Sequence, residues 1–206
     1  VEGAWTESKN DLPEYIPRQI REIKKLYPFQ KQIIRMSEEW DTRTIHIVID
    51  IEGNKGKTTI SQYLHVYKKA NIIPFCNDYK DLMRMVLCMP KLGCYMIDLP
   101  RAINKERLYQ LFSAIETIKG GYAYDDRYSF KSAVFDCPQI FVFTNIRPDT
   151  KLMTKDRWKF WNIQNKRLVP EYNYPEQVKS CIKEIRKFLG GSRPCNNIKN
   201  FIYNII

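Results

Sequence analysis

The sequence has 206 residues, 44% of them hydrophobic, which is enough to bury the core of one domain with an appendage or of two small domains. The formal net charge of +11 favours an acidic polymer as partner, because clustered Lys and Arg attract phosphate backbones; the alternative is a basic surface without a specific partner. No apolar run approaches the roughly 20 residues that cross a bilayer, so we expect no membrane association.

The six cysteines are scattered without a C-x-x-C pair, and His46 and His65 are the only histidines. This spacing indicates neither a zinc site nor a disulfide framework, and it fits a reducing intracellular compartment. The cysteines are Cys76, Cys88, Cys94, Cys137, Cys181 and Cys195.

The first part of the chain, residues 1–41, is predicted to be a linker followed by short helices. Residues 1–14 are polar and contain Gly3 and Pro13, as is typical of a linker. Residues 15–41 carry apolar side chains at helical spacing that Pro28 interrupts, which predicts two or three short helices. Because these apolar faces have no obvious place in the core of a following sheet, we predict that they mediate subunit contacts.

From residue 42 to 170, short apolar runs alternate with amphipathic segments. We expect strands at 44–50, 71–76, 94–100 and 139–145, and helices at 57–70, 78–90 and 104–121. Asn77 or Asp78 would cap the second helix. This alternation is typical of an α/β fold in which helices flank a central, mostly parallel sheet. Residues 122–136 are predicted to form a hairpin that turns at Asp125 and Asp126, and residues 171–206 a helical tail.

The stretch DIEGNKGKTT, residues 50–59, lies between the first strand and the first helix of this alternation. Its two glycines permit backbone angles that let several N–H groups converge on one anion. Lys57 would add a charge near the β- and γ-phosphates of a nucleotide, and Thr58 a hydroxyl for Mg²⁺. We therefore prefer a phosphate-binding loop to a plain charged turn. Its predicted nucleotide-binding residues are Gly53, Asn54, Lys55, Gly56, Lys57, Thr58 and Thr59.

Polar residues follow two further apolar strands. Asp98 ends the run CYMID, and Asn145 ends the run IFVFTN. Ligands of parallel sheets gather at the carboxyl ends of the strands, so Asp98 could hold Mg²⁺ together with Thr58, and Asn145 could orient a water beside a γ-phosphate. A helix cap or turn acid and an Asn turn are the alternatives for the two residues.

These three motifs in this order resemble the superfamily 3 helicases, and in particular the helicase half of replication initiator (Rep) proteins of circular single-stranded DNA viruses. The resemblance covers roughly residues 1–170. It rests on GNKGKTT as Walker A, CYMIDLPR as Walker B and IFVFTN as motif C, with VEGAWTE and YPFQKQII before them.

The resemblance implies an AAA+-like P-loop ATPase that uses ATP and Mg²⁺, with a small helical oligomerisation region ahead of it. It also implies a homo-oligomeric ring, a hexamer in the family, that travels 3′→5′ on single-stranded DNA during rolling-circle replication. A nuclease domain would precede residue 1, and the host cell nucleus would be the place of action.

The chain departs from the family pattern at two positions. Many relatives have two adjacent acids in Walker B, whereas Asp98 stands alone here, so the catalytic base is either Asp98 itself or another carboxylate such as Glu52 or Glu116. Ile51 stands where the full G-x-x-x-x-G-K-[ST] pattern has its first glycine.

In the family, the segment between Walker B and motif C carries a basic hairpin into the pore of the ring. Here Lys119, Arg127 and Lys131 would contact the phosphates of a single strand, and neighbouring aromatic rings would stack on bases or pack on their own sheet. The resemblance also makes Arg157 an arginine finger that reaches a neighbour's ATP, with Arg147 as the competing candidate. The predicted catalytic residues are thus Lys57, Asp98, Asn145 and Arg157.

The preferred interpretation is an ATP-dependent helicase domain of a viral Rep protein. The alternatives are a viral RNA helicase of related type and an oligomerising nucleic-acid-binding module whose nucleotide site is only structural. A phosphate-transferring kinase with the same loop is less favoured, because the sequence shows no evident acceptor pocket or lid.

Overall fold

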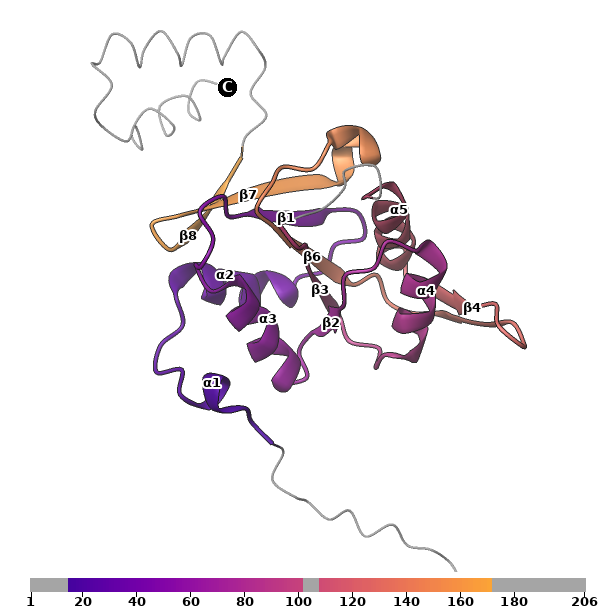
Figure 1. Ribbon diagram of the computed structural model, residues 1–206, viewed down its shortest axis with the longest axis horizontal. Helices are drawn as coiled ribbons and strands as arrows, with labels where there is room; N and C mark the ends of the chain where they lie inside the picture. The colour runs from indigo at the N-terminus through magenta and orange to yellow at the C-terminus, as the bar shows by residue number, and fades with distance from the viewer. Residues whose placement is uncertain (1–14, 102–107, 172–206) are drawn as a thin grey trace, which may run out of the picture. The chain divides into compact units, whose positions relative to one another are not determined.

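Five segments of the chain form the parallel part of one six-stranded sheet, in the order β2-β3-β6-β1-β7-β8 (Figure 1). The parallel strands are β1 (Ile45–Ile49), β2 (Asn71–Ile73), β3 (Cys94–Asp98), β6 (Gln139–Thr144) and β7 (Trp158–Gln164). β8 (Arg167–Pro170) closes one edge antiparallel to β7. The central strands β1 and β6 are buried along their whole length, as expected for strands that helices cover on both faces.

The computed structural model describes residues 15–101 and 108–171. The predicted linker at 1–14, the beginning of the helix expected from residue 104 and the predicted helical tail beyond residue 171 lie outside the described residues. Within the described residues, no helix is long and apolar enough to span a membrane.

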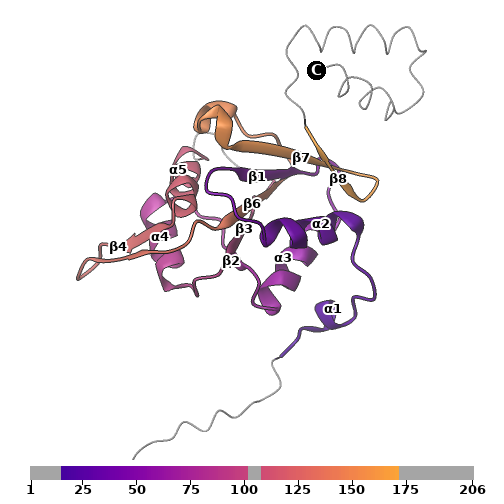
Figure 2. The same ribbon diagram turned by 180° about the vertical axis from the view of Figure 1, so that it is seen from behind.

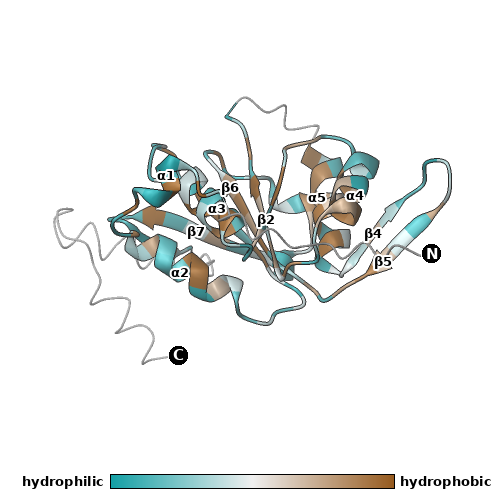
Figure 3. Ribbon diagram, turned by 90° about the horizontal axis from the view of Figure 1, so that it is seen from below, coloured by the Kyte–Doolittle hydropathy of each residue, from teal (hydrophilic) through white to brown (hydrophobic). Residues whose placement is uncertain are grey.

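Helices cover both faces of the sheet and give the described part of the chain three layers (Figures 1 and 2). α1 (Arg18–Arg21), α2 (Pro28–Ser37) and α3 (Lys57–Val66) lie on one side, and α4 (Tyr79–Cys88) and α5 (Leu108–Lys119) on the other (Figure 3). Alternate residues of β1 serve the two layers: Ile47 packs in the cluster with α4 and α5, and Val48 in the cluster with α2 and α3. The predicted α/β fold is confirmed.

The apolar face of α2 is part of the core. Phe29 and Ile33 have 0% exposed surface and pack with residues of α3 and the sheet. Pro28 does not interrupt this helix but occupies its first turn, where its missing N–H costs no hydrogen bond. The expectation that the apolar faces of residues 15–41 lack a place in the core is therefore wrong for α2.

The predicted hairpin is present as β4 (Tyr122–Asp125) and β5 (Lys131–Val134), which form a separate two-stranded sheet. Its turn is attached to α4, because Asp126 accepts hydrogen bonds from Lys80 at 2.6 Å and from Arg84 at 2.7 Å. These cations lower the pKa of Asp126. Two short 3-10 turns, η2 (Thr150–Leu152) and η3 (Lys155–Arg157), connect β6 to β7.

Candidate active site

The loop between β1 and α3 curls tightly at the carboxyl edge of the sheet. Gly53, Asn54 and Gly56 all have positive φ angles, of 80°, 57° and 90°, and Gly56 is the N-cap of α3. Backbone angles of this kind let a loop curl tightly enough for its N–H groups to surround an anion at a helix N-terminus. The predicted tight glycine turn ahead of a helix is therefore present, and its binding of phosphate stays a prediction.

Lys57 opens α3 with a side chain that is only 9% exposed. Its Nζ lies 3.4 Å from Oδ2 of Asp50, a carboxylate whose side chain is fully buried. A buried ammonium needs such a counter-charge, and Asp50 provides it at the start of the loop. Asp50 Oδ1 also accepts the Gly53 N–H at 2.9 Å, which fixes the loop's first turn.

Asp50 is a site residue that the sequence interpretation did not assign. Within the described residues its Oδ2 has no hydrogen-bond partner and lies 3.4 Å from Lys57 Nζ, while Oδ1 lies 3.7 Å from Lys55 Nζ. The signal was available, since an acid directly after an apolar strand and directly before the glycines is placed at the carboxyl edge.

The two predicted Mg²⁺ ligands meet across neighbouring segments of the site. Thr58 Oγ1 donates a hydrogen bond of 2.9 Å to Asp98 Oδ2, although the residues are 40 positions apart in the chain. A hydroxyl and a carboxylate are hard oxygen donors of the kind that Mg²⁺ takes, together with water and substrate phosphates. The described residues contain no cluster of three or more His, Cys, Asp or Glu side chains for an all-protein metal site. The donor set therefore fits a metal held partly by a nucleotide.

Asn145 lies at the same edge of the sheet, directly after β6. Its Nδ2 donates to the carbonyl oxygen of Asp50, so the amide is fixed beside the start of the loop. The Lys55 ammonium is held by three groups of its own chain: Nζ donates to the carbonyl of Ile163 at 3.1 Å, pairs with Glu52 at 2.9 Å and lies 3.7 Å from Asp50 Oδ1. Lys55 therefore shares the Asp50 carboxylate with Lys57. Thr59 follows in the first turn of α3.

Arg157 lies at the opposite, amino edge of the sheet. It directly precedes β7, and the first residue of that parallel strand, Trp158, pairs with Ile45 at the beginning of β1. Arg157 Nε lies 2.9 Å from Glu116 Oε1. Arg157 and Glu116 are therefore both distant from the loop between β1 and α3. This position argues against Glu116 as the catalytic base. Any contact of Arg157 with a nucleotide requires a neighbouring subunit.

Arg147, the competing finger candidate, follows β6 at the carboxyl edge. Its guanidinium carbon lies 4.0 Å from the centroid of the Phe160 ring and the side chain pairs with Glu171. Both contacts hold it within its own subunit. The sequence-based preference between Arg157 and Arg147 remains a prediction.

The burial of Lys119 contradicts its predicted role in DNA binding. The side chain has 0% exposed surface, and Nζ donates to the carbonyls of Asp41 at 2.6 Å and Pro138 at 2.8 Å. Burial lowers the pKa of this ammonium. Lys119 ties the end of α5 to the segments before β1 and β6, and no phosphate backbone can reach it.

The two other predicted DNA contacts are at the surface of the hairpin. Lys131 is exposed, whereas Arg127 is half-exposed and its guanidinium donates two hydrogen bonds to Asp125, at 3.0 and 3.1 Å. Tyr128, at the tip, is fully exposed with a φ of 55°, while the rings of Tyr124 and Phe130 stack at 6.0 Å. The hairpin therefore offers one cation without a carboxylate partner among the described residues, one that is already paired, and one free ring.

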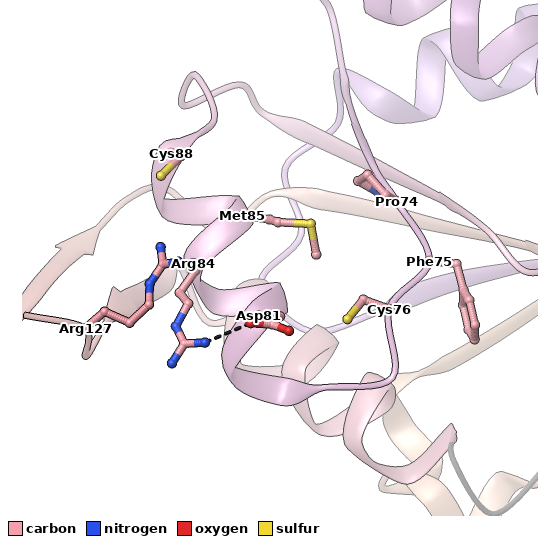
Figure 4. Close-up of a pocket in the computed structure, with 8 residues that line it drawn as sticks. All are labelled: Pro74, Phe75, Cys76, Asp81, Arg84, Met85, Cys88 and Arg127. Atoms are coloured by element: carbon pink, nitrogen blue, oxygen red, sulfur yellow. Dashed lines mark hydrogen bonds and ion pairs between the residues drawn. The ribbon is translucent and has the colours of Figure 1, made fainter.

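A surface pocket of about 490 Å³ lies between the hairpin, α4 and the segment after β2 (Figure 4). Arg84 and Arg127 line it beside Met85, and Arg84 bonds to Asp81 at 2.8 Å. Because acids already neutralise both arginines, the pocket has no free charge for an anion.

Comparison with known proteins gives a similarity over part of the chain. No protein family matches the chain. One relative is Para-Rep C6 of the Subterranean clover stunt C6 alphasatellite, which is 28% identical over 137 residues. The match covers 65% of this chain and 46% of the relative, so the chain spans about half the length of the protein it matches.

Proposed function

We propose that this chain is the ATPase part of a Rep-like replication initiator, of the superfamily 3 helicase type. The observation that carries the proposal is the hydrogen bond between Thr58 and Asp98, which joins the glycine loop to the acid after β3. Asn145 and the buried Lys57 lie at the same edge. The similarity to Para-Rep C6 supports the replication role.

Each residue would have a separate task toward ATP. The loop's N–H groups and Lys57 bind and orient the phosphates, and Lys57 leaves Asp50 to offset charge on the transferring group. Mg²⁺, held by Thr58 and Asp98, would supply further charge stabilisation when bound. Asn145 orients the attacking water. The base is Asp98 itself or Glu52, which is exposed on the loop.

The action on DNA would follow from assembly. A homo-oligomeric ring places the hairpins around a pore, where Lys131 and Arg127 contact the phosphates of a single strand. The net charge of +11 supports a nucleic-acid partner. The ring, a preceding nuclease domain and action in the host cell nucleus are further parts of this proposal, taken from the resemblance to Rep proteins. The match covers 46% of the relative, so the activities of a whole Rep protein are proposed for this chain and not shown.

The test is ATP turnover with and without single-stranded DNA. Lys57→Ala is expected to remove most turnover, and Asp98→Asn to lose Mg²⁺-dependent turnover while some nucleotide binding remains. Lys69→Ala is a matched control, since Lys69 lies just beyond the same helix and pairs at the surface with Glu38. Unchanged ATP turnover in a folded Lys57→Ala protein would contradict the ATPase proposal.

The polynucleotide is tested separately from the ATPase. Matched DNA and RNA strands compete for the protein while turnover is recorded. Stimulation by DNA alone supports the DNA helicase, and equal or stronger stimulation by RNA favours an RNA helicase. Nucleotide binding with no turnover under either condition favours a binding module whose nucleotide stabilises the assembly.

A further inference from the structure

A cationic side chain from the segment after β3 lies directly over the phosphate-binding loop. A methyl group built on Gly53 would overlap Nη2 of Arg101 and would come within 3.4 Å of its guanidinium carbon. Gly53 also has a φ of 80°, which disfavours any side chain. The loop therefore needs glycine here both for its curvature and for the close approach of Arg101.

The charge of Arg101 is not neutralised within the part of the chain that the structure describes. The side chain is exposed and has no carboxylate partner among residues 15–101 and 108–171. Six of the nine other arginines in the described ranges are different, because each pairs with a carboxylate; these are Arg18, Arg43, Arg84, Arg127, Arg147 and Arg157. An unpaired guanidinium with five donors beside a phosphate-binding loop is suited to bind a phosphate.

The position of Arg101 is determined by the same strand that supplies the predicted metal ligand. Asp98 ends β3 and accepts the Thr58 hydroxyl, and Arg101 follows three residues later over Gly53. The segment thus contacts the loop at two points. Asn145 Nδ2 is close to the same place, 3.7 Å from the methyl position on Gly53. Arg101 and Asn145 therefore approach the loop from the side on which β3 and β6 end.

We propose that Arg101 binds the terminal phosphate of a nucleoside triphosphate held in its own subunit. This inference rests on the proposed function and adds to it a residue that distinguishes triphosphate from diphosphate. Lys57 and the loop's N–H groups bind phosphates from within the loop, and the Arg101 guanidinium covers the terminal one from the side of Asn145. A forked donor can bind two phosphate oxygens at once, which an ammonium cannot do with the same geometry.

The experiment compares two nucleotides instead of relying on turnover. Affinities for ADP and for a non-hydrolysable ATP analogue, AMP-PNP, are measured with Mg²⁺ by calorimetry for wild type, Arg101→Gln and Arg101→Lys. Arg21→Gln is the control, because Arg21 is an exposed arginine at the end of α1, and thermal unfolding verifies the fold of each variant.

Arg101→Gln is expected to weaken AMP-PNP binding about tenfold and ADP binding less than about threefold, because a charge-assisted hydrogen bond is lost with the terminal phosphate alone. Arg101→Lys should fall between wild type and Arg101→Gln, and Arg21→Gln should match wild type. Unchanged AMP-PNP affinity in Arg101→Gln, or an equal loss for both nucleotides, would overturn the role of Arg101. Wild-type protein that binds neither nucleotide would overturn the ATPase proposal as well.

Discussion

Arg157 Nε and Glu116 Oε1 lie 2.9 Å apart at the amino edge of the sheet, and each residue had a predicted catalytic role. The pair is partly buried, with side chains that are 18% and 30% exposed. Within one subunit the two charges therefore satisfy one another, far along the strands from the loop after β1. A role in catalysis requires that Arg157 exchange this partner for a phosphate of the neighbouring subunit.

The first prediction tests this exchange by mixing inactive proteins. Arg157→Ala lacks the finger and Lys57→Ala lacks the loop cation, so each alone should turn over little ATP. Their mixture should recover part of the activity, because some interfaces combine an intact loop with an intact arginine. ATP turnover is measured across mixing ratios, alongside proof of mixed oligomers by native mass spectrometry.

Arg147→Ala provides the comparison for that experiment. If mixed oligomers form and only the mixture of Arg147→Ala with Lys57→Ala regains turnover, Arg147 is the finger and the Arg157–Glu116 pair is structural. Thermal unfolding of Glu116→Gln shows how much the pair contributes to the fold.

The second prediction concerns the buried Lys119. Lys119→Met should lower the free energy of unfolding by about 1–3 kcal/mol, because the carbonyls of Asp41 and Pro138 lose a charged donor. The affinity for single-stranded DNA of the folded variant should equal that of wild type. Urea unfolding and DNA titration check the two parts, with Lys31→Met, at an exposed position of α2, as the control. A selective loss of DNA affinity would restore Lys119 to the DNA-binding surface.

Much of the site could be predicted because its signals are local. Glycines between an apolar strand and a helix, and polar residues directly after two further strands, are visible in short windows of the sequence. Parallel pairing then brings Lys57, Asp98 and Asn145 to one edge without any knowledge of side-chain contacts. The strand order followed no such local signal and required the structure.

The errors arose where distant contacts decide the outcome. Lys119 ends an amphipathic helix and has the pattern of a surface lysine, but Asp41 and Pro138 surround it from elsewhere in the chain. Strand β7 was not predicted, since Trp158–Gln164 mixes aromatic and polar residues and follows a segment without strand signals. Arg101 was part of the recognised CYMIDLPR run, yet nothing local indicates that it reaches Gly53.

The third prediction is a loss of stability in mild acid that depends on His46. Burial first, and then the charge of Lys159, lower the pKa of His46 to about 4, and its Nδ1 accepts the Trp161 indole N–H at 3.0 Å. The unfolded chain has a pKa near 6.5 and binds more protons between these values, so stability falls as the pH decreases. At pH 5 the loss from this group is about 2 kcal/mol relative to pH 7.

His46→Gln provides the comparison, because its amide oxygen can still accept the Trp161 N–H and does not titrate. Urea unfolding at pH 7 and pH 5 should show a smaller loss for the variant than for wild type. Equal losses in the two proteins would assign the acid sensitivity to other groups.

The fourth prediction follows from the burial of α2. Phe29→Ala should destabilise the fold by about 3–5 kcal/mol, because it removes a fully buried ring and leaves a cavity beneath the helix. Removal of residues 1–41 would expose the same face of the sheet, so unfolding would accompany any loss of assembly. Tyr15→Ala, at an exposed position in the same region, tests assembly without this complication. Urea unfolding and size-exclusion chromatography measure the two effects.

The last prediction concerns the hairpin, where Lys131 and Arg127 are the cations left for DNA. Replacing both with Ala should weaken binding of single-stranded DNA to the same degree for every sequence, because phosphates carry no base identity. Each lost phosphate contact should also lower the slope of log affinity against log salt by about 0.7. Lys131 is expected to contribute more than Arg127, which must first leave Asp125.

The control for the hairpin is Lys24→Ala combined with Lys31→Ala, which removes the same charge from exposed positions of the N-terminal region. Affinities are measured at several salt concentrations for wild type, the hairpin variant and this control. If the hairpin is solvated and does not contact DNA, the hairpin variant and the control variant should have the same slope, because both lose the same net charge. A reduced slope in the hairpin variant alone places the two side chains at the DNA backbone.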